Sequence, residues 1–235
     1  MQYMEEEIME IRFEERKQLK EKPDQKHLGF GKYMTDYMFI MDWDKDQGWH
    51  DARIVPQGPI ELDPACVTLH YAQETFEGLK AYRTAEGKIQ LFRPEMNARR
   101  MINSNARLCM PAFPEDMFVE AVRALVKQEA DWVPSEPDTS LYIRPFMFAT
   151  EAALGVHMAS SYKFMIICCP VGAYYATGLD PVKILVEDEL VRAVKGGTGF
   201  TKCGGNYAGS ILGQVKAEKM GYAQVLWLDG EHRKY

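Results

Sequence analysis

The chain has 235 residues, of which 46% are hydrophobic and 26% are charged, a balance that is typical of a globular protein with a sizeable core. Its formal net charge is −6 and the two signs are mixed along the chain, which disfavours nucleic acid as a partner. No apolar run approaches membrane-spanning length, and residues 5–7 are acidic where a secretory signal would be basic. We therefore expect a cytoplasmic protein without a membrane partner.

Metal binding is not indicated by the cysteines or the histidines. The five cysteines have no CxxC spacing, and two of them lie inside an apolar run, so we expect buried, reduced thiols. The five histidines lack the i, i+4 spacing and the cysteine pairs of a zinc site. We expect no metal.

The first 170 residues predict a sheet with two helices. Apolar or alternating runs predict strands over 8–12, 37–43, 49–55, 80–84, 89–92, 141–149 and 163–169, with a hairpin at Gly87. A helix is expected over 95–108, ending before Pro111. A second helix follows Pro114, and its core face is predicted from the i, i+4, i+7 and i+8 spacing of Phe118, Val122, Leu125 and Val126.

Residues 171–182 have the composition of a linker. After it we expect a strand over 182–186, a helix over 206–220 capped by Gly221, and a strand over 225–228. The chain thus divides into a small N-terminal α/β domain (1–170), the linker (171–182) and the start of a second domain (183–235). The overall class is α+β, with an open first domain and a second domain near the lower size limit for independent folding.

Lys202 lies in a run with six glycines between Gly196 and Gly209. A Walker A loop is excluded because Thr201 and Cys203 flank the lysine, and the dinucleotide fingerprint fails because Lys202 occupies the place of its third glycine. Two interpretations remain: an amine held partly desolvated to attack a carbonyl, or an exposed lysine in a mobile loop. For an isolated motif of this kind the second is the more common.

Several segments resemble the branched-chain amino-acid aminotransferases, and they occur in the family's order along most of the chain. They are FEGLKAY at 76–82, LFRP at 91–94, NARR at 97–100, SLYIRP at 140–145, CPVGAY at 169–174, GGTG at 196–199 and KCGGNY at 202–207. The resemblance implies a two-domain fold type IV enzyme with a C-terminal pseudo-barrel. It also implies pyridoxal 5′-phosphate as cofactor and amino transfer from L-leucine, L-isoleucine or L-valine to 2-oxoglutarate by a ping-pong mechanism.

The resemblance also assigns roles to residues. Lys202 would bind the cofactor covalently and later carry a proton, Arg100 (rather than Arg99) would hold the phosphate, Tyr207 would bind the phenolic oxygen, and Arg192 would support the phosphate end. An apolar substrate pocket is implied for Phe30, Tyr71, Phe76, Tyr142 and Tyr174. Tyr142 and Arg144 alternate with Ile143 on one strand, so both should face an entering carboxylate.

Members of the family continue beyond this length into a segment whose glutamate pairs with the pyridine nitrogen, so we expect the 235 residues to be a fragment of a complete enzyme. The family further implies a homodimer. Two other fold type IV enzymes, D-amino-acid aminotransferase and aminodeoxychorismate lyase, share the lysine but not the aromatic pocket. An inactive ligand-binding module is the alternative from a different class.

Overall fold

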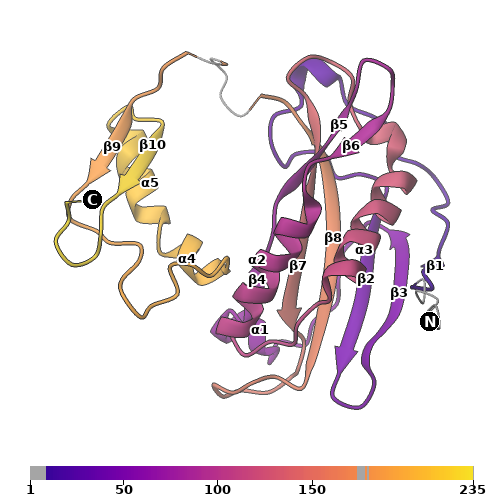
Figure 1. Cartoon of the computed structure of the whole chain (residues 1–235), viewed down its shortest axis with the longest axis horizontal. Coiled ribbons are helices and arrows are strands. Elements are labelled where there is room, and N and C mark those ends of the chain that lie inside the picture. Colours follow the sequence, from indigo (N-terminus) through magenta and orange to yellow (C-terminus); the bar gives the residue numbers. More distant parts are fainter. Residues whose placement is uncertain (1–8, 174–177, 179, 235) are drawn as a thin grey trace, which may run out of the picture.

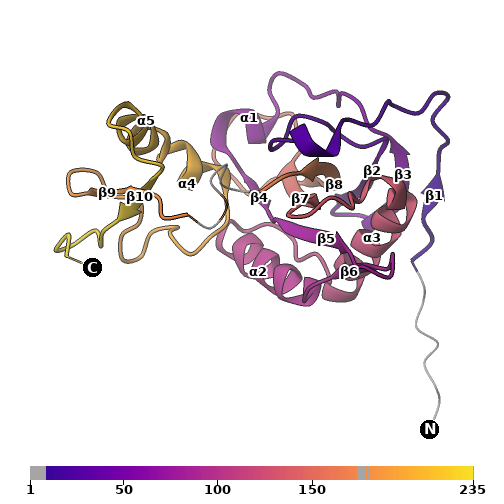
Figure 2. The same ribbon diagram turned by 90° about the horizontal axis from the view of Figure 1, so that it is seen from above.

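Most of the protein is one curled sheet with two long helices on one face (Figures 1 and 2). The computed structural model describes residues 9–173, 178 and 180–234. The strands of this sheet are β1 Arg12–Phe13, β2 Tyr37–Asp44, β3 Gly48–Pro56, β4 Glu74–Phe76, β5 Leu79–Arg83, β6 Ile89–Leu91, β7 Ser140–Ala149 and β8 Ser161–Val171. Their order is β1-β3-β2-β8-β7-β5-β6, and β4 also pairs with β7.

All pairings in the sheet are antiparallel except that of β1 with β3. The sequence pattern explains the central strand β7, in which apolar Leu141, Ile143 and Met147 are buried and Tyr142 and Arg144, which alternate with them, are only partly so. One face of the sheet therefore packs on the main core, whereas the other carries Tyr142 and Arg144 and also a smaller apolar cluster of Met38, Ile40, Phe148 and Met165. The predicted α+β class is confirmed.

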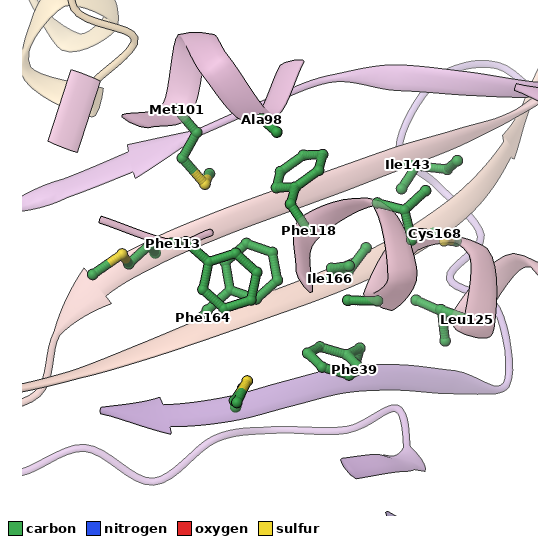
Figure 3. Close-up of a cluster of buried hydrophobic side chains, with 14 of the residues drawn as sticks. Phe39, Ala98, Met101, Phe113, Phe118, Leu125, Ile143, Phe164, Ile166 and Cys168 are labelled. Carbon is green, nitrogen blue, oxygen red and sulfur yellow. The ribbon is translucent and has the colours of Figure 1, made fainter. Parts of the chain in front are cut away.

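The core lies between the sheet and the helices α2 Pro94–Arg107 and α3 Glu115–Gln128. Helix α2 was predicted within a residue of both observed ends, and α3 begins directly after Pro114, as predicted. The predicted α3 face is confirmed, because Phe118, Val122 and Leu125 are completely buried. Figure 3 shows Phe118 beside the stacked rings of Phe113 and Phe164, whose centroids are 3.8 Å apart. Burial of each such side chain contributes about 1.5–3 kcal/mol to stability.

Three short elements depart from the sequence prediction. The strand predicted over 8–12 was wrong for residues 9–11, because the chain pairs with β3 only at Arg12 and Phe13; residue 8 lies outside the described part. Helix α1 Val67–Tyr71 and strand β4 were missed, since five and three residues are too few to show a period. Two 3-10 helices, Gln25–His27 and Ala130–Trp132, complete this part.

A two-stranded parallel sheet follows, made of β9 Ile184–Glu187 and β10 Gln224–Trp227, close to the two strands that were predicted there. The single helix predicted over 206–220 was wrong: α4 Gly204–Ala208 and α5 Ile211–Lys219 are separate. Both the amide and the hydroxyl of Ser210 donate to the Tyr207 carbonyl, which an unbroken helix would offer to residue 211.

The predicted cap of α5 is confirmed. Gly221 has φ +77°, its amide donates to Glu218 and the amide of Tyr222 donates to Ala217, which is the Schellman pattern. Glycine is required at this position because other residues adopt such a φ only with strain.

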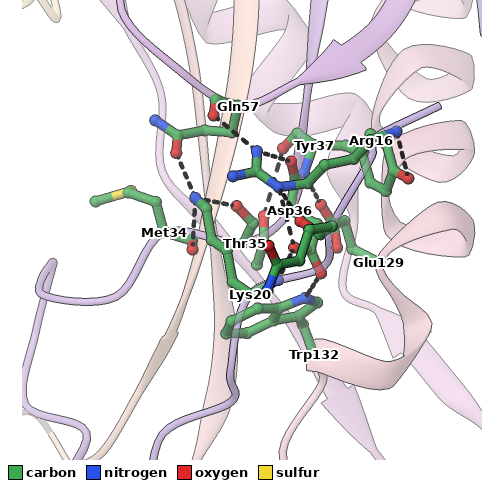
Figure 4. A network of polar contacts seen from close by, with 10 residues as sticks. Arg16, Lys20, Met34, Thr35, Asp36, Tyr37, Gln57, Glu129 and Trp132 are labelled. Carbon is green, nitrogen blue, oxygen red and sulfur yellow. Dashed lines mark hydrogen bonds and ion pairs between the residues drawn. The ribbon is translucent and has the colours of Figure 1, made fainter. Parts of the chain in front are cut away.

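A buried polar network ties the N-terminal segment to β2 and to the end of α3 (Figure 4). The Glu129 carboxylate accepts a hydrogen bond from the Tyr37 amide, and Trp132 Nε1 donates to Asp36 Oδ2 at 2.7 Å. Lys20 Nζ donates to the Thr35 carbonyl at 2.8 Å and to Gln57 Oε1 at 2.5 Å. Burial raises the pKa of Glu129 to about 7.

All five thiols are unpaired. Four of them, at positions 66, 168, 169 and 203, are buried as expected, whereas Cys109 is exposed, so the prediction was wrong there. In the described part of the chain, no helix is long and apolar enough to cross a bilayer.

Candidate active site

The site forms where the glycine-rich run meets strand β4 and helix α2. The contacting residues of both elements lie more than ninety residues before the run in sequence. The Phe76 amide donates to the Lys202 carbonyl at 3.0 Å, and the Lys202 amide donates to the buried Ser104 hydroxyl of α2 at 2.9 Å. The backbone of Lys202 is thus fixed from both sides. Figures 1 and 2 both show α4 beside β4 and α2.

The Lys202 amine lies in an aromatic surrounding. Its Nζ is 2.6 Å from the Tyr207 hydroxyl and 4.4 Å from the centre of the Phe76 ring. The rings of Phe76 and Tyr207 themselves meet edge to face at 4.8 Å. The side chain is therefore held by defined neighbours and is only partly exposed, unlike a lysine in a mobile loop.

The turn that carries Lys202 is stabilised by Asn206. Its Nδ2 donates to the carbonyls of Thr198 and Thr201, both at 2.7 Å, and its Oδ1 accepts from the Thr198 hydroxyl at 2.8 Å. Three hydrogen bonds from one side chain thus close the glycine-rich run onto α4. This explains why the run can hold a lysine in place without regular structure of its own.

Glu74 joins β4 to the first turn of α4. Its carboxylate accepts a hydrogen bond from the Gly204 amide, and burial raises the pKa of Glu74, while this hydrogen bond and Arg144 oppose the effect. The contact depends on glycine, since a Cβ at Gly204 would lie 2.1 Å from Glu74 Oε1.

Tyr142 and Arg144 of β7 form one wall of the site. Arg144 Nη2 donates to the Tyr142 hydroxyl at 3.0 Å, and the guanidinium carbon lies 4.8 Å from the Phe76 ring centre. The Phe30 ring meets Tyr142 edge to face at 4.9 Å. The predicted common orientation of Tyr142 and Arg144 is confirmed, and the wall combines aromatic rings with one cation.

Arg100 of α2 forms a forked pair with Glu77. Its Nε and Nη2 donate to the two carboxylate oxygens at 2.6 and 2.7 Å, and Glu77 is fully buried. Donation to Glu77 raises the pKa of Arg100, and the hydroxyls of Tyr207 and Tyr142 lie near enough to add to this shift. Arg99 instead forms a fork with Glu115 on the surface. Of the two arginines, Arg100 is the one that lies near the hydroxyls of Tyr207 and Tyr142.

Two of the residues assigned by resemblance contact residues other than those of the wall that Tyr142 and Arg144 form. Arg192 is exposed in the loop after β9, where it lines a cavity of about 820 Å³ together with Tyr207 and Ile211. The Tyr71 hydroxyl accepts from the Gly155 amide at 2.9 Å and its ring lies by His70, not by the aromatic cluster. Tyr174 lies outside the described residues.

Five residues described at the site received no role from the sequence, namely Glu74, Glu77, Gly78, Ser104 and Asn206. A single acid between apolar neighbours, followed by two arginines on the next helix, is a signal that could have indicated Glu77. Ser104 gives no such signal, because its contact with Lys202 spans 98 residues of sequence.

In architecture the chain falls in the class of the fold type IV aminotransferases. It matches a solved branched-chain amino acid aminotransferase from T.th., which contains pyridoxamine 5′-phosphate, with a TM-score of 0.66 and 28% identity over 81% of this chain and 60% of that one. The Escherichia coli enzyme of the same name gives 0.67 and 25%, with 83% and 60% covered. No family model matches the chain.

Sequence relatives point to the same family. The chain is 56% identical over 226 residues to a probable branched-chain-amino-acid aminotransferase of Staphylococcus epidermidis, covering 96% of this chain. It is 55% identical to branched-chain-amino-acid transaminase 1 of Bacillus subtilis, covering 92%. These relatives and the solved structures above are all branched-chain amino-acid aminotransferases, to which the chain is similar in both sequence and fold. It spans 63% and 61% of the length of these two relatives.

Proposed function

We propose that the protein transfers the amino group of L-leucine, L-isoleucine or L-valine to 2-oxoglutarate in two half-reactions, with pyridoxal 5′-phosphate as its cofactor. The observation that carries the proposal is the position of the Lys202 amine, 2.6 Å from the hydroxyl of Tyr207, which in turn lies near Arg100. A chain 55% identical that is named a branched-chain transaminase, and a solved neighbour with pyridoxamine 5′-phosphate, support the choice of reaction and cofactor.

The donor set fits a phosphorylated pyridine aldehyde. It offers one amine, one phenol and one guanidinium within a single cluster, which suit an aldehyde carbon, a phenolate oxygen and a phosphate respectively. When bound, this cofactor supplies an electron sink for negative charge at the substrate's α-carbon.

The protein's own residues would bind the cofactor and transfer the proton. Lys202 would hold the cofactor through its amine and would carry a proton to and from the substrate's α-carbon. Tyr207 would donate to the phenolate oxygen, and Arg100 would hold the phosphate, with Arg192 as a weaker candidate for that end. The guanidinium fork can donate to two phosphate oxygens at once, with a fixed geometry that a point charge lacks.

Substrate selection would fall to the aromatic wall. Phe30, Phe76 and Tyr142 offer apolar surface to a branched side chain, whereas Arg144 offers a cation to the side-chain carboxylate of glutamate. Tyr71 and Tyr174 remain candidates from the resemblance alone. Apolar packing distinguishes homologous side chains by only about 1–3 kcal/mol per methylene, so we expect all three branched substrates to react.

The domain division at 171–182, a homodimeric state and a cytoplasmic location are part of the same proposal. The division is supported by the change from the large antiparallel sheet to the small parallel one. The dimer rests on the family resemblance, and the location rests on the sequence composition.

The test is glutamate formation from L-leucine and 2-oxoglutarate with added pyridoxal 5′-phosphate. Lys202→Ala should abolish turnover, while the matched variant Lys195→Ala, which changes an exposed lysine just before the glycine-rich run, should retain it. Borohydride reduction should attach the cofactor to the peptide that contains Lys202. Turnover of D-alanine without L-leucine would favour the D-amino-acid enzyme, and a protein that never takes up the cofactor would overturn the proposal.

A further inference from the structure

The Glu77 carboxylate is the most completely surrounded acid of the site. It has no exposed surface, and besides the two bonds from Arg100 it accepts one from Asn97 Nδ2 at 2.8 Å and a longer one from the Gly78 amide at 3.3 Å. Burial of a carboxylate is costly unless donors surround it, and here four do. The Glu77 carboxylate is therefore held in one position by its hydrogen bonds.

Glu77 is also fixed through its backbone. Its amide donates to the Pro145 carbonyl of β7 at 2.7 Å, next to Arg144 of the aromatic wall. Asn97 Nδ2 additionally reaches the Gly78 carbonyl at 3.2 Å, so helix α2 clips the turn between β4 and β5. The carboxylate cannot move without moving this turn.

Three consecutive residues, the last of β4 and the two of the turn, each meet a different part of the site. The Phe76 ring lies under the Lys202 amine, Glu77 holds Arg100, and Gly78 leaves the space that the Tyr142 hydroxyl fills. The segment thus sets the lysine, the arginine and the tyrosine relative to one another.

Arg100 uses only one edge of its guanidinium for the pair. Nε and one N–H of Nη2 point to Glu77, whereas half of the side-chain surface remains exposed. A planar fork held along one edge leaves its other N–H groups directed in a fixed direction. These unpaired N–H groups can donate two hydrogen bonds to a second partner.

We propose that Glu77 is a positioning residue, whose buried carboxylate orients Arg100 so that the free guanidinium edge receives the phosphate of the cofactor. The inference rests on the proposed function, because it takes the phosphate from the cofactor assigned there. Glu77 itself touches neither cofactor nor substrate.

Two effects of removing the Glu77 charge oppose each other. Without the carboxylate the guanidinium carries uncompensated charge, which would attract phosphate more strongly. However, Arg100 is half exposed, so solvent screens that gain. Without Glu77 the Arg100 guanidinium also loses its fixed orientation. Arginine recognises phosphate through two parallel hydrogen bonds, which require that orientation. Orientation should therefore dominate.

The experiment measures dissociation constants of pyridoxal 5′-phosphate and of pyridoxal, which lacks the phosphate, by absorbance titration. In Glu77→Gln the constant for pyridoxal 5′-phosphate should rise about 10- to 100-fold, the range for losing a hydrogen bond to a charged group. The constant for pyridoxal should stay unchanged. Glu115→Gln, which removes the equivalent fork of Arg99, is the matched control and should change neither.

Glu77→Asp separates position from charge and serves if the glutamine variant fails to fold. It keeps the charge but withdraws the carboxylate by one methylene, so it should also weaken the phosphate ligand selectively. In an Arg100→Ala background, Glu77→Gln should have no further effect on that constant.

Equal weakening of both ligands would indicate a merely structural role and overturn the inference, as would unchanged or tighter binding of the phosphate form. Those results leave the proposed function intact. A wild-type protein that binds neither ligand would overturn the proposed function, and this inference with it.

Discussion

Gly78 shows how a single missing side chain sets the geometry of the site. A Cβ at this position would lie 2.2 Å from the Tyr142 hydroxyl and 3.0 Å from the ring carbon that bears it. The same hydroxyl accepts two hydrogen bonds from Arg144, so it is not free to move aside. The glycine is needed for close approach and not for its backbone angles, since Gly78 is not among the residues with positive φ.

We predict that Gly78→Ala lowers kcat/KM for L-leucine at least tenfold, because a displaced Tyr142 loses its contact with Arg144 and narrows the apolar wall. Loss of one such hydrogen bond to a charged group is worth about 1.5–3 kcal/mol. The control is Gly58→Ala, since a Cβ there meets no atom within 4 Å. If both variants keep full activity, Tyr142 does not shape the pocket.

Some other features of single site residues could be predicted from the sequence. The alternation around Ile143 predicted the shared face of Tyr142 and Arg144, and the failed phosphate-loop patterns pointed away from nucleotides. The choice between Arg99 and Arg100 came only from the resemblance. Their separate partners, Glu115 and Glu77, come from tertiary contacts that no local pattern encodes.

Helix α5 shows the same principle at the level of an element. Gly213 lies inside this helix, where glycine is normally unfavourable, and a Cβ there would lie 2.6 Å from Cη2 of Trp227 in β10. The helix therefore packs closely on the small parallel sheet, because the absence of a side chain at Gly213 leaves room for the Trp227 ring. Packing explains a residue that helix propensity disfavours.

Gly213→Ala sets two effects against each other. Alanine gains up to about 1 kcal/mol in helix propensity, whereas forcing a methyl group against a packed ring typically costs about 1–3 kcal/mol. We predict a net loss, seen as faster amide hydrogen exchange in α5. The double variant Gly213→Ala/Trp227→Phe, with a smaller ring, should restore slow exchange. Slower exchange in the single variant would mean that the ring gives way easily.

The length and periodicity of each segment determined how well the sequence predicted its structure. Long periodic segments such as α3 and β7 were predicted well, because each shows several repeats of its own period. The break between α4 and α5 was not, since it depends on Ser210 binding the Tyr207 carbonyl. The two-residue pairing of β1 was overestimated because apolar residues 9 and 11 pack on the core without joining the sheet.

For the molecule as a whole, the polar network around Glu129 couples folding to pH (Figure 4). Burial is the main reason why the Glu129 pKa is raised from 4.5 to about 7, and the neighbouring Asp36 charge adds to it. The folded protein therefore binds a proton more tightly than the unfolded chain does. Between about pH 4.5 and 7 the unfolded state loses this proton first, so stability falls as pH rises through that window.

We predict that the wild-type free energy of unfolding declines between pH 5 and pH 7.5, with up to roughly 3 kcal/mol of the decline due to Glu129, the equivalent of its pKa shift. Glu129→Gln keeps the shape and an acceptor for the Tyr37 amide but cannot ionise, so its decline should be smaller by that amount. Glu136→Gln, an exposed acid in the following loop, should decline as the wild type does. Urea unfolding at several pH values makes the comparison. Parallel curves for Glu129→Gln and wild type would show that this carboxylate is already ionised in the folded protein at low pH, and that the network around Asp36 tolerates its charge.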